Sequence, residues 1–494
     1  MTIKRILLIQ PPVTSFKLGD FTPSMPLGLA YIAGVLEKEG YHVQILDALV
    51  EGWNNVKKLP DQKFQIGLSR EEIKKRIDAV RPDVVGVSSM FTSQWRNAAD
   101  IAAAVKEIGR DIPVVVGGAH PTAAPESVIS DSSVDFVVVG EGEVTFLQLL
   151  KAIGEKSDVA EIKGILYKSN GEVRSTGDPV YIEDLDAIPF PARHLLPLEK
   201  YFAIGLSHGG RRRHRRFTSI VTSRGCPAQC VFCSAHKLWG QKYRVRSPEN
   251  VIGEMRQLKA DFGIEELSIE DDNFTLNKER ANAILDRMVK EELDIAWDTP
   301  NGVAVYALDK PLIRKMKESG CYRINFPIES GNQDFLTRVI KKPLQLDKVP
   351  DLVNYARKIG LEISTFFVVG VPGETEETIK DTFRFARAIG VYDPFISIAT
   401  PYPGSSMLEL CRARGYLVHD FDPTNLTINQ YNIETPELPI RKFRRILKRE
   451  GIKMRAYRYL SIFGDPHVLW EKVTSVFKNK NRGIKNAMVK EGVS

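Results

Sequence analysis

Short apolar runs alternate with amphipathic stretches along the first third of the chain. The apolar runs are rich in β-branched residues and fall at Arg5–Ile9, Val43–Leu46, Val84–Ser88, Val114–Val116 and Phe136–Val139. Stretches with helical periodicity separate them, at Leu27–Glu39, Arg70–Val80, Trp95–Ile108 and Val144–Ile153. Because parallel strands covered on both faces are continuously apolar, this alternation predicts a doubly wound, Rossmann-like α/β domain. Its ligands are expected at the carboxyl ends of the strands.

A second alternation of strands and helices follows and has the same character. The predicted strands are Thr218–Thr222, Glu266–Glu270, Ile295–Asp298, Tyr322–Ile328, Ser364–Val369 and Phe395–Thr400. The predicted helices are Asn250–Ala260, Lys278–Val289, Lys310–Glu318, Asp347–Lys358 and Glu376–Ile389. This series favours a partial (β/α)6 TIM-like barrel with its active face at the carboxyl ends of the strands. The predicted organisation is a first domain at 1–180, a linker at 181–216, the barrel at 217–430 and a helical region at 431–494.

Composition places the chain among ordinary globular proteins. It has 494 residues, of which 43% are hydrophobic and 27% are charged. These values exclude a disordered chain, a collagen and a disulfide-rich secreted scaffold. Apolar runs are too short for a membrane-spanning helix, and Gln10, Pro11 and Pro12 end the first one too early for a signal peptide. The expected location is therefore the cytoplasm.

Positive charge gathers at the C-terminal end. The net charge is +7, and residues 441–494 hold 15 of the 69 Lys and Arg but only 4 of the 62 Asp and Glu. Within Arg441–Leu460, Phe443, Ile446 and Leu447 share one helical face. Two interpretations stay open: this stripe packs on the barrel, or the helix contacts an anionic membrane, which would favour a lipid substrate. The basic run Arg211–Arg216 is either a solvated loop or a phosphate contact.

The strongest chemical signal is a cluster of three cysteines. The chain has five cysteines, and Cys226, Cys230 and Cys233 form a CxxxCxxC loop after a predicted strand. Three thiolates on a four-iron cluster leave one iron open to a chelating small molecule. The alternative is a zinc site with His236 as fourth ligand, since structural zinc takes four. Cys321 and Cys411 lie in apolar patterns and are expected to pack in the core.

Polar residues and glycines follow the predicted strands of the first domain. They share a position at one edge of the sheet, where glycine lets a bulky ligand approach the backbone. The alternative is that these residues only terminate tight turns. The predicted rim consists of Ser88, Ser89, Gly117, Gly118, His120, Glu141, Gly142 and Glu143.

The loop resembles a known superfamily. CxxxCxxC with Phe232 before the third cysteine is typical of radical S-adenosylmethionine enzymes. The Ser223–Pro227 stretch and the preceding sheet resemble the cobalamin-binding branch, typified by the anaerobic magnesium-protoporphyrin IX monomethyl ester cyclase. The resemblance implies a 4Fe-4S cluster on the three cysteines, S-adenosylmethionine on the open iron, and cobalamin on the first sheet.

The resemblance also implies roles for residues at the barrel's strand ends. Phe232 would lie near the adenine, Asp271 and Asp272 would meet the methionine amine, and Glu329 would bind the ribose. The other implied contacts are Ser330, Gly331, Gly370 and Gly373.

The usual cobalamin ligand pattern, Asp-x-His-x-x-Gly, is absent from the sequence. His120 follows Gly117 and Gly118 but lacks the preceding aspartate. The branch often binds cobalamin without a histidine on cobalt, and that is the expectation here. A degenerate domain that no longer binds cobalamin is the alternative.

Several functions fit these motifs. The leading one is C-methylation of an unactivated carbon in a lipid or another small molecule, with electrons from a donor such as flavodoxin or ferredoxin. Cyclisation or ring rearrangement without methyl transfer is the second. A zinc-bearing nucleic-acid binder is disfavoured because it leaves both α/β series unexplained. A tRNA methylthiotransferase is disfavoured because no cysteine precedes Cys226, and no specific nucleic-acid partner is expected.

Overall fold

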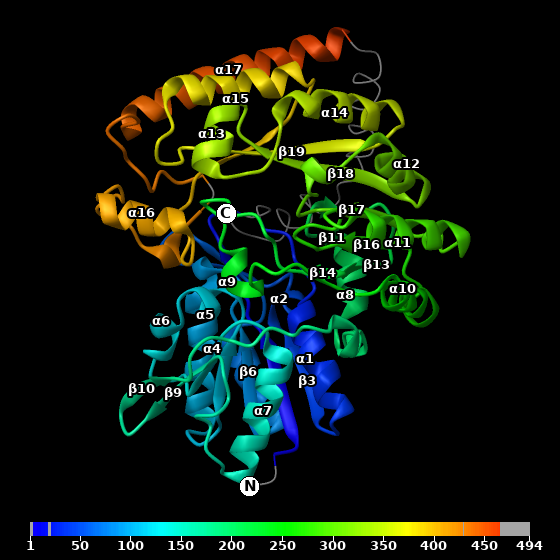
Figure 1. The fold of residues 1–494 in the computed structure, drawn as a ribbon. Coiled ribbons are helices and arrows are strands. Elements are labelled where there is room, and N and C mark those ends of the chain that lie inside the picture. Colours follow the sequence, from blue (N-terminus) through cyan, green and yellow to red (C-terminus); the bar gives the residue numbers. More distant parts are fainter. Residues whose placement is uncertain (1–2, 18–20, 428, 465–494) are drawn as a thin grey trace.

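The structure is a computed structural model that describes residues 3–17, 21–427 and 429–464. Two α/β units lie one above the other, with the N-terminal unit in blue and cyan and the barrel in green and yellow (Figure 1). The predicted fold class is confirmed: an α/β sheet domain is followed by a parallel barrel sheet and a C-terminal helix.

The N-terminal sheet has the strand order β10-β9-β8-β7-β6-β1-β3. Its parallel strands are β1 (Arg5–Gln10), β3 (His42–Asp47), β6 (Val84–Ser88), β7 (Val114–Gly117) and β8 (Phe136–Val138). The hairpin of β9 (Ile165–Ser169) and β10 (Glu172–Ser175) adds an antiparallel edge. Chain order reverses between β1 and β6, so the carboxyl ends of these two strands form the crevice where such folds bind ligands.

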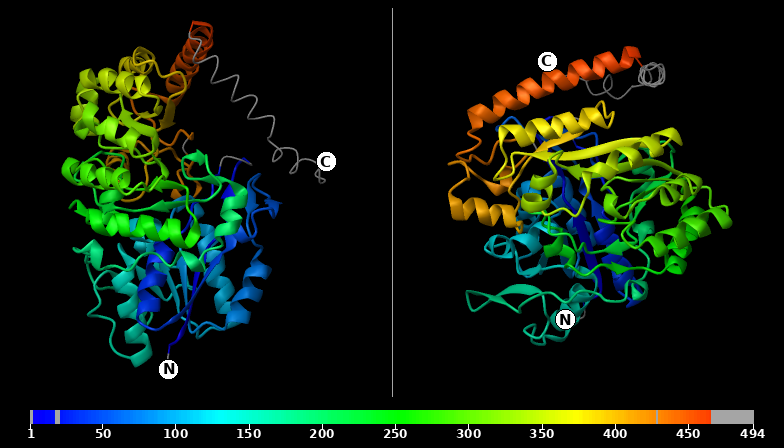
Figure 2. Two further views of the ribbon diagram at one scale, coloured as in Figure 1. Left: turned by 90° about the vertical axis from the view of Figure 1, so that its right-hand side faces the viewer. Right: turned by 45° about the horizontal axis from the view of Figure 1, so that its top comes forward.

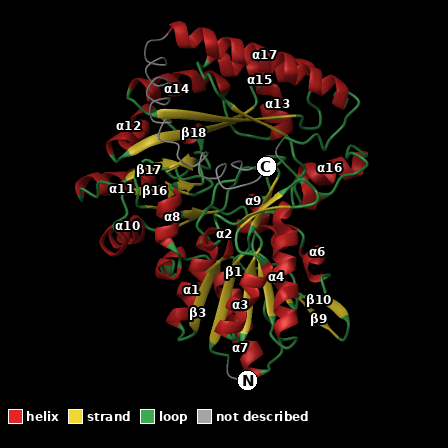
Figure 3. Ribbon diagram, turned by 180° about the vertical axis from the view of Figure 1, so that it is seen from behind, coloured by secondary structure: helices red, strands yellow, loops and turns green. Residues whose placement is uncertain are grey.

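Alternation along β1 shows why this sheet is covered on both faces. Ile6 and Leu8 join the core with α1 (Leu27–Lys38) and α7 (Gly142–Glu155). Leu7 and Ile9 join a second core with α3 (Arg70–Val80) and α4 (Trp95–Ile108). Shorter helices α2 (Ala48–Glu51), α5 (Ala119–Ala123) and α6 (Pro125–Ile129) complete the unit. Figure 3 shows the yellow strands enclosed by red helices.

The barrel sheet contains six parallel strands in chain order, as a partial barrel requires. They are β13 (Phe217–Ile220), β16 (Glu266–Ile269), β17 (Ala296–Thr299), β18 (Cys321–Glu329), β19 (Glu362–Val369) and β20 (Phe395–Ile398). The helices on the outside are α10 (Pro248–Phe262), α11 (Lys278–Lys290), α12 (Lys310–Glu318), α14 (Val349–Lys358) and α15 (Glu376–Ala388). The shorter α13 (Gln333–Phe335), a π-helical turn (Leu336–Ile340) and α16 (Ser406–Arg414) lie in later connections.

The stretch predicted as a linker is folded. It contains α8 (Leu198–Ile204) and a hairpin of β11 (Leu206–Ser207) with β12 (Gly210–Arg211). Arg212 belongs to the basic run predicted as a solvated loop or a phosphate contact. It is buried instead and donates to Ser268 and Asp298 of the barrel strands at 2.6 and 3.1 Å. The pairing with Asp298 stabilises a guanidinium that would be costly to bury alone.

The basic C-terminal helix α17 (Ile440–Gly464) lies along α15 on the outside of the barrel (Figure 2). Phe443 and Ile446 are buried there, and Arg449 pairs with Glu376 of α15 at 2.7 Å. The apolar stripe therefore packs on the barrel, and residues 465–494 of the predicted tail lie outside the described residues. In the described part of the chain, no helix is both long and apolar enough to cross a membrane.

One small sheet was not predicted from the sequence, whereas the burial of two cysteines was. A small antiparallel sheet of β2 (Val13–Ser15), β5 (Phe64–Ile66) and β4 (Val56–Lys58) stands beside the N-terminal unit and was missed. Cys321 and Cys411 are buried, as expected.

Candidate functional site

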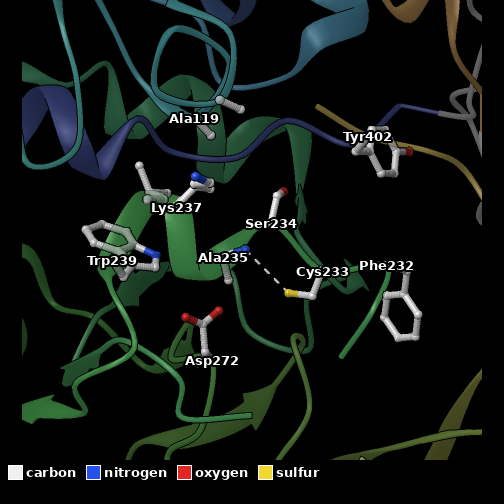
Figure 4. Close-up of a pocket in the computed structure, with 11 residues that line it drawn as sticks. Ala119, Phe232, Cys233, Ser234, Ala235, Lys237, Trp239, Asp272 and Tyr402 are labelled. Carbon is white, nitrogen blue, oxygen red and sulfur yellow. Dashed lines mark hydrogen bonds between the residues drawn. The ribbon is translucent and has the colours of Figure 1, made fainter. Parts of the chain in front are cut away.

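A cavity of about 360 Å³ lies between the N-terminal unit and the barrel. Ala119 and Ala123 of α5 line one side, while Phe232, Cys233 and α9 (Ala235–Trp239) line another (Figure 4). Asp272 and Tyr402 complete the lining. The third cysteine of the loop and the edge of the N-terminal sheet thus open on the same space.

The cysteine loop is held from several sides. It follows β14 (Ser223–Arg224), which pairs with β15 (Arg244–Val245). The Val231 amide donates to the carbonyl of Ile340 at 3.1 Å, and the Val231 carbonyl accepts from Met407 at 2.9 Å. Gly225 has φ +88°, and a Cβ there would lie 2.2 Å from the Lys242 carbonyl oxygen. Only glycine fits this turn.

The three thiols suit an iron–sulfur cluster chemically. Burial raises the pKa of Cys230 to about 11 and that of Cys233 to about 12, so their thiolates need a cation beside them. The Asn273 amide donates to Cys226 Sγ at 2.8 Å and orients the first thiol. A zinc site would gather its ligands on one ion. Among the described residues, no group of three or more His, Cys, Asp or Glu side chains is close enough to hold a single ion.

The two adjacent aspartates predicted at the amine lie in different surroundings. Asp271 is buried and accepts hydrogen bonds of 2.5 Å from the Thr222 amide, the Thr222 hydroxyl and the Ser223 hydroxyl. Its carboxylate therefore ties the ends of β13 and β16 together. Asp272 lines the cavity, and burial, followed by the charge of Asp271, raises its pKa to about 6. Asp272 is thus the carboxylate of the two that faces the cavity, and its contact with the methionine amine stays a prediction.

Glu329, the predicted ribose contact, ends β18 in a strained conformation with φ +73°. Its carboxylate pairs with Lys342 Nζ at 3.0 Å. Strained backbone of this kind gathers at functional sites. The neighbouring Ser330 and Gly331 face Thr382 of α15: the Gly331 amide donates to its hydroxyl at 3.0 Å. Lys342 was missed in the sequence because no motif marks it.

The turn that holds the predicted contacts Gly370 and Gly373 is fixed by a buried carboxylate. The Gly370 amide donates to Glu374, and burial raises the pKa of Glu374 to about 8. Gly370 and Gly373 have φ of +88° and +92°, where glycine is strongly preferred. A Cβ on Gly370 would lie 2.7 Å from the Phe443 ring of α17. The C-terminal helix therefore supports this turn from behind.

At the edge of the N-terminal sheet, two buried polar atoms fit a polar ligand. Ser89 Oγ and His120 Nε2 have no hydrogen-bond partner among the residues that the structure describes. Buried polar atoms in native proteins are nearly always hydrogen-bonded, and the amide side chains of cobalamin are suitable partners for these two. His120 Nδ1 contacts Thr92 Oγ1 at 3.2 Å, and burial lowers the pKa of His120 to about 4. Ser88 and Gly117 end β6 and β7, and Gly118 packs against the Ser89 backbone.

The two glutamates of the predicted rim form ion pairs with arginines of the barrel unit. Arg224 donates to Glu141 at 2.8 Å and to Glu143 at 2.6 Å, and Arg244 donates to Glu141 at 2.8 Å. All four side chains are buried. Glu141, Gly142 and Glu143 thus join the two units beside the cysteine loop, and a contact with cobalamin stays a prediction for them.

Comparison with protein families assigns both units. Residues 22–150 match the B12 binding domain, and residues 220–386 match the radical SAM superfamily. The chain belongs to the cobalamin-binding branch of the radical S-adenosylmethionine superfamily. The predicted 4Fe-4S cluster, S-adenosylmethionine and cobalamin are therefore its cofactors.

Similar proteins include several methyltransferases. The cytidylyl-2-hydroxyethylphosphonate methyltransferase of Streptomyces wedmorensis is 34% identical over 88% of this chain and 86% of its own. An uncharacterised methyltransferase of Pyrococcus horikoshii is 34% identical over 99% of this chain and 98% of its own. The anaerobic magnesium-protoporphyrin IX monomethyl ester cyclase of Rubrivivax gelatinosus is 27% identical over 87% of this chain and 73% of its own.

Solved structures share the fold. The methyltransferase TsrM of Kitasatospora setae, with cobalamin and a 4Fe-4S cluster bound, matches with a TM-score of 0.67 and 20% identity over 84% of this chain and 79% of its own. The cobalamin-dependent radical enzyme OxsB matches with a TM-score of 0.70 and 16% identity over 97% of this chain and 75% of its own. The sheet-then-barrel order is thus common to these proteins.

Proposed function

We propose that this chain is a radical C-methyltransferase that places a methyl group on an unactivated carbon of a small molecule. One observation carries the proposal: Cys233 and the α5 edge of the B12 domain line the same cavity. Bound here, the reduced cluster with S-adenosylmethionine supplies a carbon radical, and cobalamin supplies a transferable methyl group. A single substrate could meet both in this cavity.

Residues of this chain would bind the cofactors, orient them and shield them from water. The thiolates of Cys226, Cys230 and Cys233 would hold the cluster, with Asn273 orienting the first. Asp272 would accept hydrogen bonds from the methionine amine, since carboxylates bind ammonium groups strongly. Glu329 would accept from the ribose hydroxyls.

Other residues would control the space around these groups. Ser89 and His120 would meet polar groups of the corrin. Phe232, Trp239 and Tyr402 line the cavity and would exclude water from reactive species.

A second candidate is cyclisation or rearrangement without methyl transfer, which the similarity to the monomethyl ester cyclases supports. The two relatives that are 34% identical are both methyltransferases, and this favours methyl transfer. In either case we infer that a one-electron donor such as flavodoxin or ferredoxin reduces the cluster in the cytoplasm.

The Streptomyces relative is named for its substrate, cytidylyl-2-hydroxyethylphosphonate, and this compound is therefore the first to test as a substrate. A lipid substrate is the other choice, since a hopanoid C-3 methylase is 25% identical over 77% of this chain. The buried stripe of α17 gives that choice no support, because Phe443 and Ile446 are not free to enter a membrane.

The test uses S-adenosylmethionine that carries a CD3 group. Reconstituted protein, a reductant and small-molecule extract from the cells that natively make it are incubated without oxygen. Mass spectrometry should find the CD3 group in a small molecule. The variant with all three loop cysteines changed to alanine is the control and should give none. Radical cleavage of S-adenosylmethionine without any labelled product would contradict methyl transfer.

A further inference from the structure

A histidine–glutamate pair lies at the mouth of the barrel, apart from the residues assigned above. His208 is in the turn of the β11–β12 hairpin, and Glu270 directly follows β16. His208 Nδ1 lies 2.8 Å from Glu270 Oε2. Because Glu270 precedes Asp271 and Asp272 at the same strand end, the pair lies on the active side of the barrel.

The pair is held rigidly. Glu270 accepts from the Ser219 hydroxyl at 3.2 Å, and Asn301 donates to its carbonyl at 2.8 Å and its carboxylate at 3.3 Å. Arg212 donates to the His208 carbonyl at 2.9 Å and, through Asp298 and Ser268, anchors the hairpin inside the barrel. The hairpin therefore has its own anchor, and the imidazole of His208 is not needed to keep it in place.

The other ring nitrogen of His208 is directed away from Glu270. Within the described residues Nε2 makes no hydrogen bond, and the side chain is 44% exposed, whereas Glu270 is only 16% exposed. Burial lowers the pKa of His208, but the hydrogen bond and charge of Glu270 outweigh it and raise the pKa overall. A carboxylate that fixes one imidazole nitrogen and leaves the other free is the arrangement by which enzymes present histidine to a reactant.

We propose that His208, oriented by Glu270, binds a hydroxyl group of the substrate, which is therefore an alcohol rather than a hydrocarbon lipid. A hydroxyl both donates and accepts, so it can bond to Nε2 in either protonation state of the ring. An apolar substrate would cover His208 and Asn301 without replacing their hydrogen bonds to water, which is unfavourable. This inference rests on the proposed function and deepens it by naming the substrate class.

The first test is the identity of the labelled product from the CD3 experiment. The inference predicts a product that bears a hydroxyl, and it predicts that the analogue lacking that hydroxyl is turned over far more slowly, since sites built to bond a hydroxyl reject such analogues strongly. A labelled product without a hydroxyl, or a deoxy analogue that reacts equally well, would overturn this inference alone. No labelled product at all would overturn the proposed function as well.

The second test compares two histidine variants with the identified substrate. His208→Gln should raise KM about tenfold, the loss of one hydrogen bond to a charged or polar partner. Glu270→Gln should also raise KM, because the imidazole of His208 loses the carboxylate that orients it. The matched control is His194→Gln, since His194 pairs with Glu37 at 3.1 Å on the exposed surface of the other unit. Equal KM values for His208→Gln and His194→Gln would overturn the assignment.

Discussion

The cysteine loop and the edge of the N-terminal sheet were both predicted as cofactor sites, but on different grounds. In the loop, residue type and spacing carry the chemistry. In the structure Cys226 and Cys230 lie near Cys233, and Asn273 donates to Cys226. At the sheet edge the prediction used only position after a strand. There Ser89 and His120 have buried atoms without a partner in the described part of the chain, while Glu141 and Glu143 bind arginines. Position at a strand end thus predicts proximity to a site but not the partner of the side chain.

The largest expected effect lies in the loop. Changing Cys226, Cys230 and Cys233 together to alanine should remove the iron and abolish reductive cleavage of S-adenosylmethionine, because no thiolate of the loop remains to hold the cluster. Iron analysis and visible absorption measure this. Cys411→Ala, outside the loop, should keep the iron. Full iron in the triple variant would show that the cluster is held elsewhere.

A large effect on stability is expected where the two units meet. Arg224→Ala would leave Glu141 and Glu143 buried with fewer partners, and such a break costs about 3–5 kcal/mol. The control is Arg384→Ala, whose exposed pair with Glu377 is worth about 0–1 kcal/mol. Urea unfolding compares the two. A similar small loss of unfolding free energy in both variants would mean that the ion pairs of Arg224 do not hold the units together.

Glu329→Gln should weaken S-adenosylmethionine binding about tenfold to a hundredfold, the loss of a hydrogen bond to a charged group. Iron content should stay at the wild-type level, since the loop is untouched. Equilibrium binding measures the affinity, with Glu377→Gln on the exposed surface as control. Unchanged affinity would move the ribose contact to another residue.

His120 should make folding sensitive to acid. Its pKa is lowered by burial to about 4, so between pH 6.5 and 4 the unfolded chain binds more protons than the folded chain. The free energy of unfolding should therefore fall as the pH falls through this window, by up to about 1.4 kcal/mol per pH unit. The stability difference between wild type and His120→Gln, measured at several pH values, isolates this residue. A difference independent of pH would show that His120 does not titrate this way.

The smallest effect is expected in the cobalamin spectrum. If no protein histidine binds cobalt, the bound cofactor should show a base-off spectrum, and His120→Ala should change it little. A nitrogen-ligated signal that disappears in this variant would place His120 Nε2 on the cobalt. The residue type of His120 would then determine cofactor binding at the sheet edge, as the cysteines do in the loop.

Local patterns predicted most of the fold. The strand Val84–Ser88 and the helices Arg70–Val80, Trp95–Ile108 and Lys310–Glu318 have the predicted bounds, because the strand is a continuous apolar run and the helices have periodic apolar residues. The β11–β12 hairpin was missed because it depends on pairing Arg212 with Asp298, 86 residues away. The same limit applies to Lys342, to the arginine partners of Glu141, and to the different surroundings of Asp271 and Asp272.

Quantifying the two coproducts of S-adenosylmethionine in one reaction tests methyl transfer most directly. Each turnover should consume one molecule as methyl donor and one as radical source. S-Adenosylhomocysteine and 5′-deoxyadenosine should then accumulate in equal amounts, both dependent on substrate and both in step with the methylated product. 5′-Deoxyadenosine formed with substrate but without matching S-adenosylhomocysteine would contradict methyl transfer and favour the cyclase-type reaction.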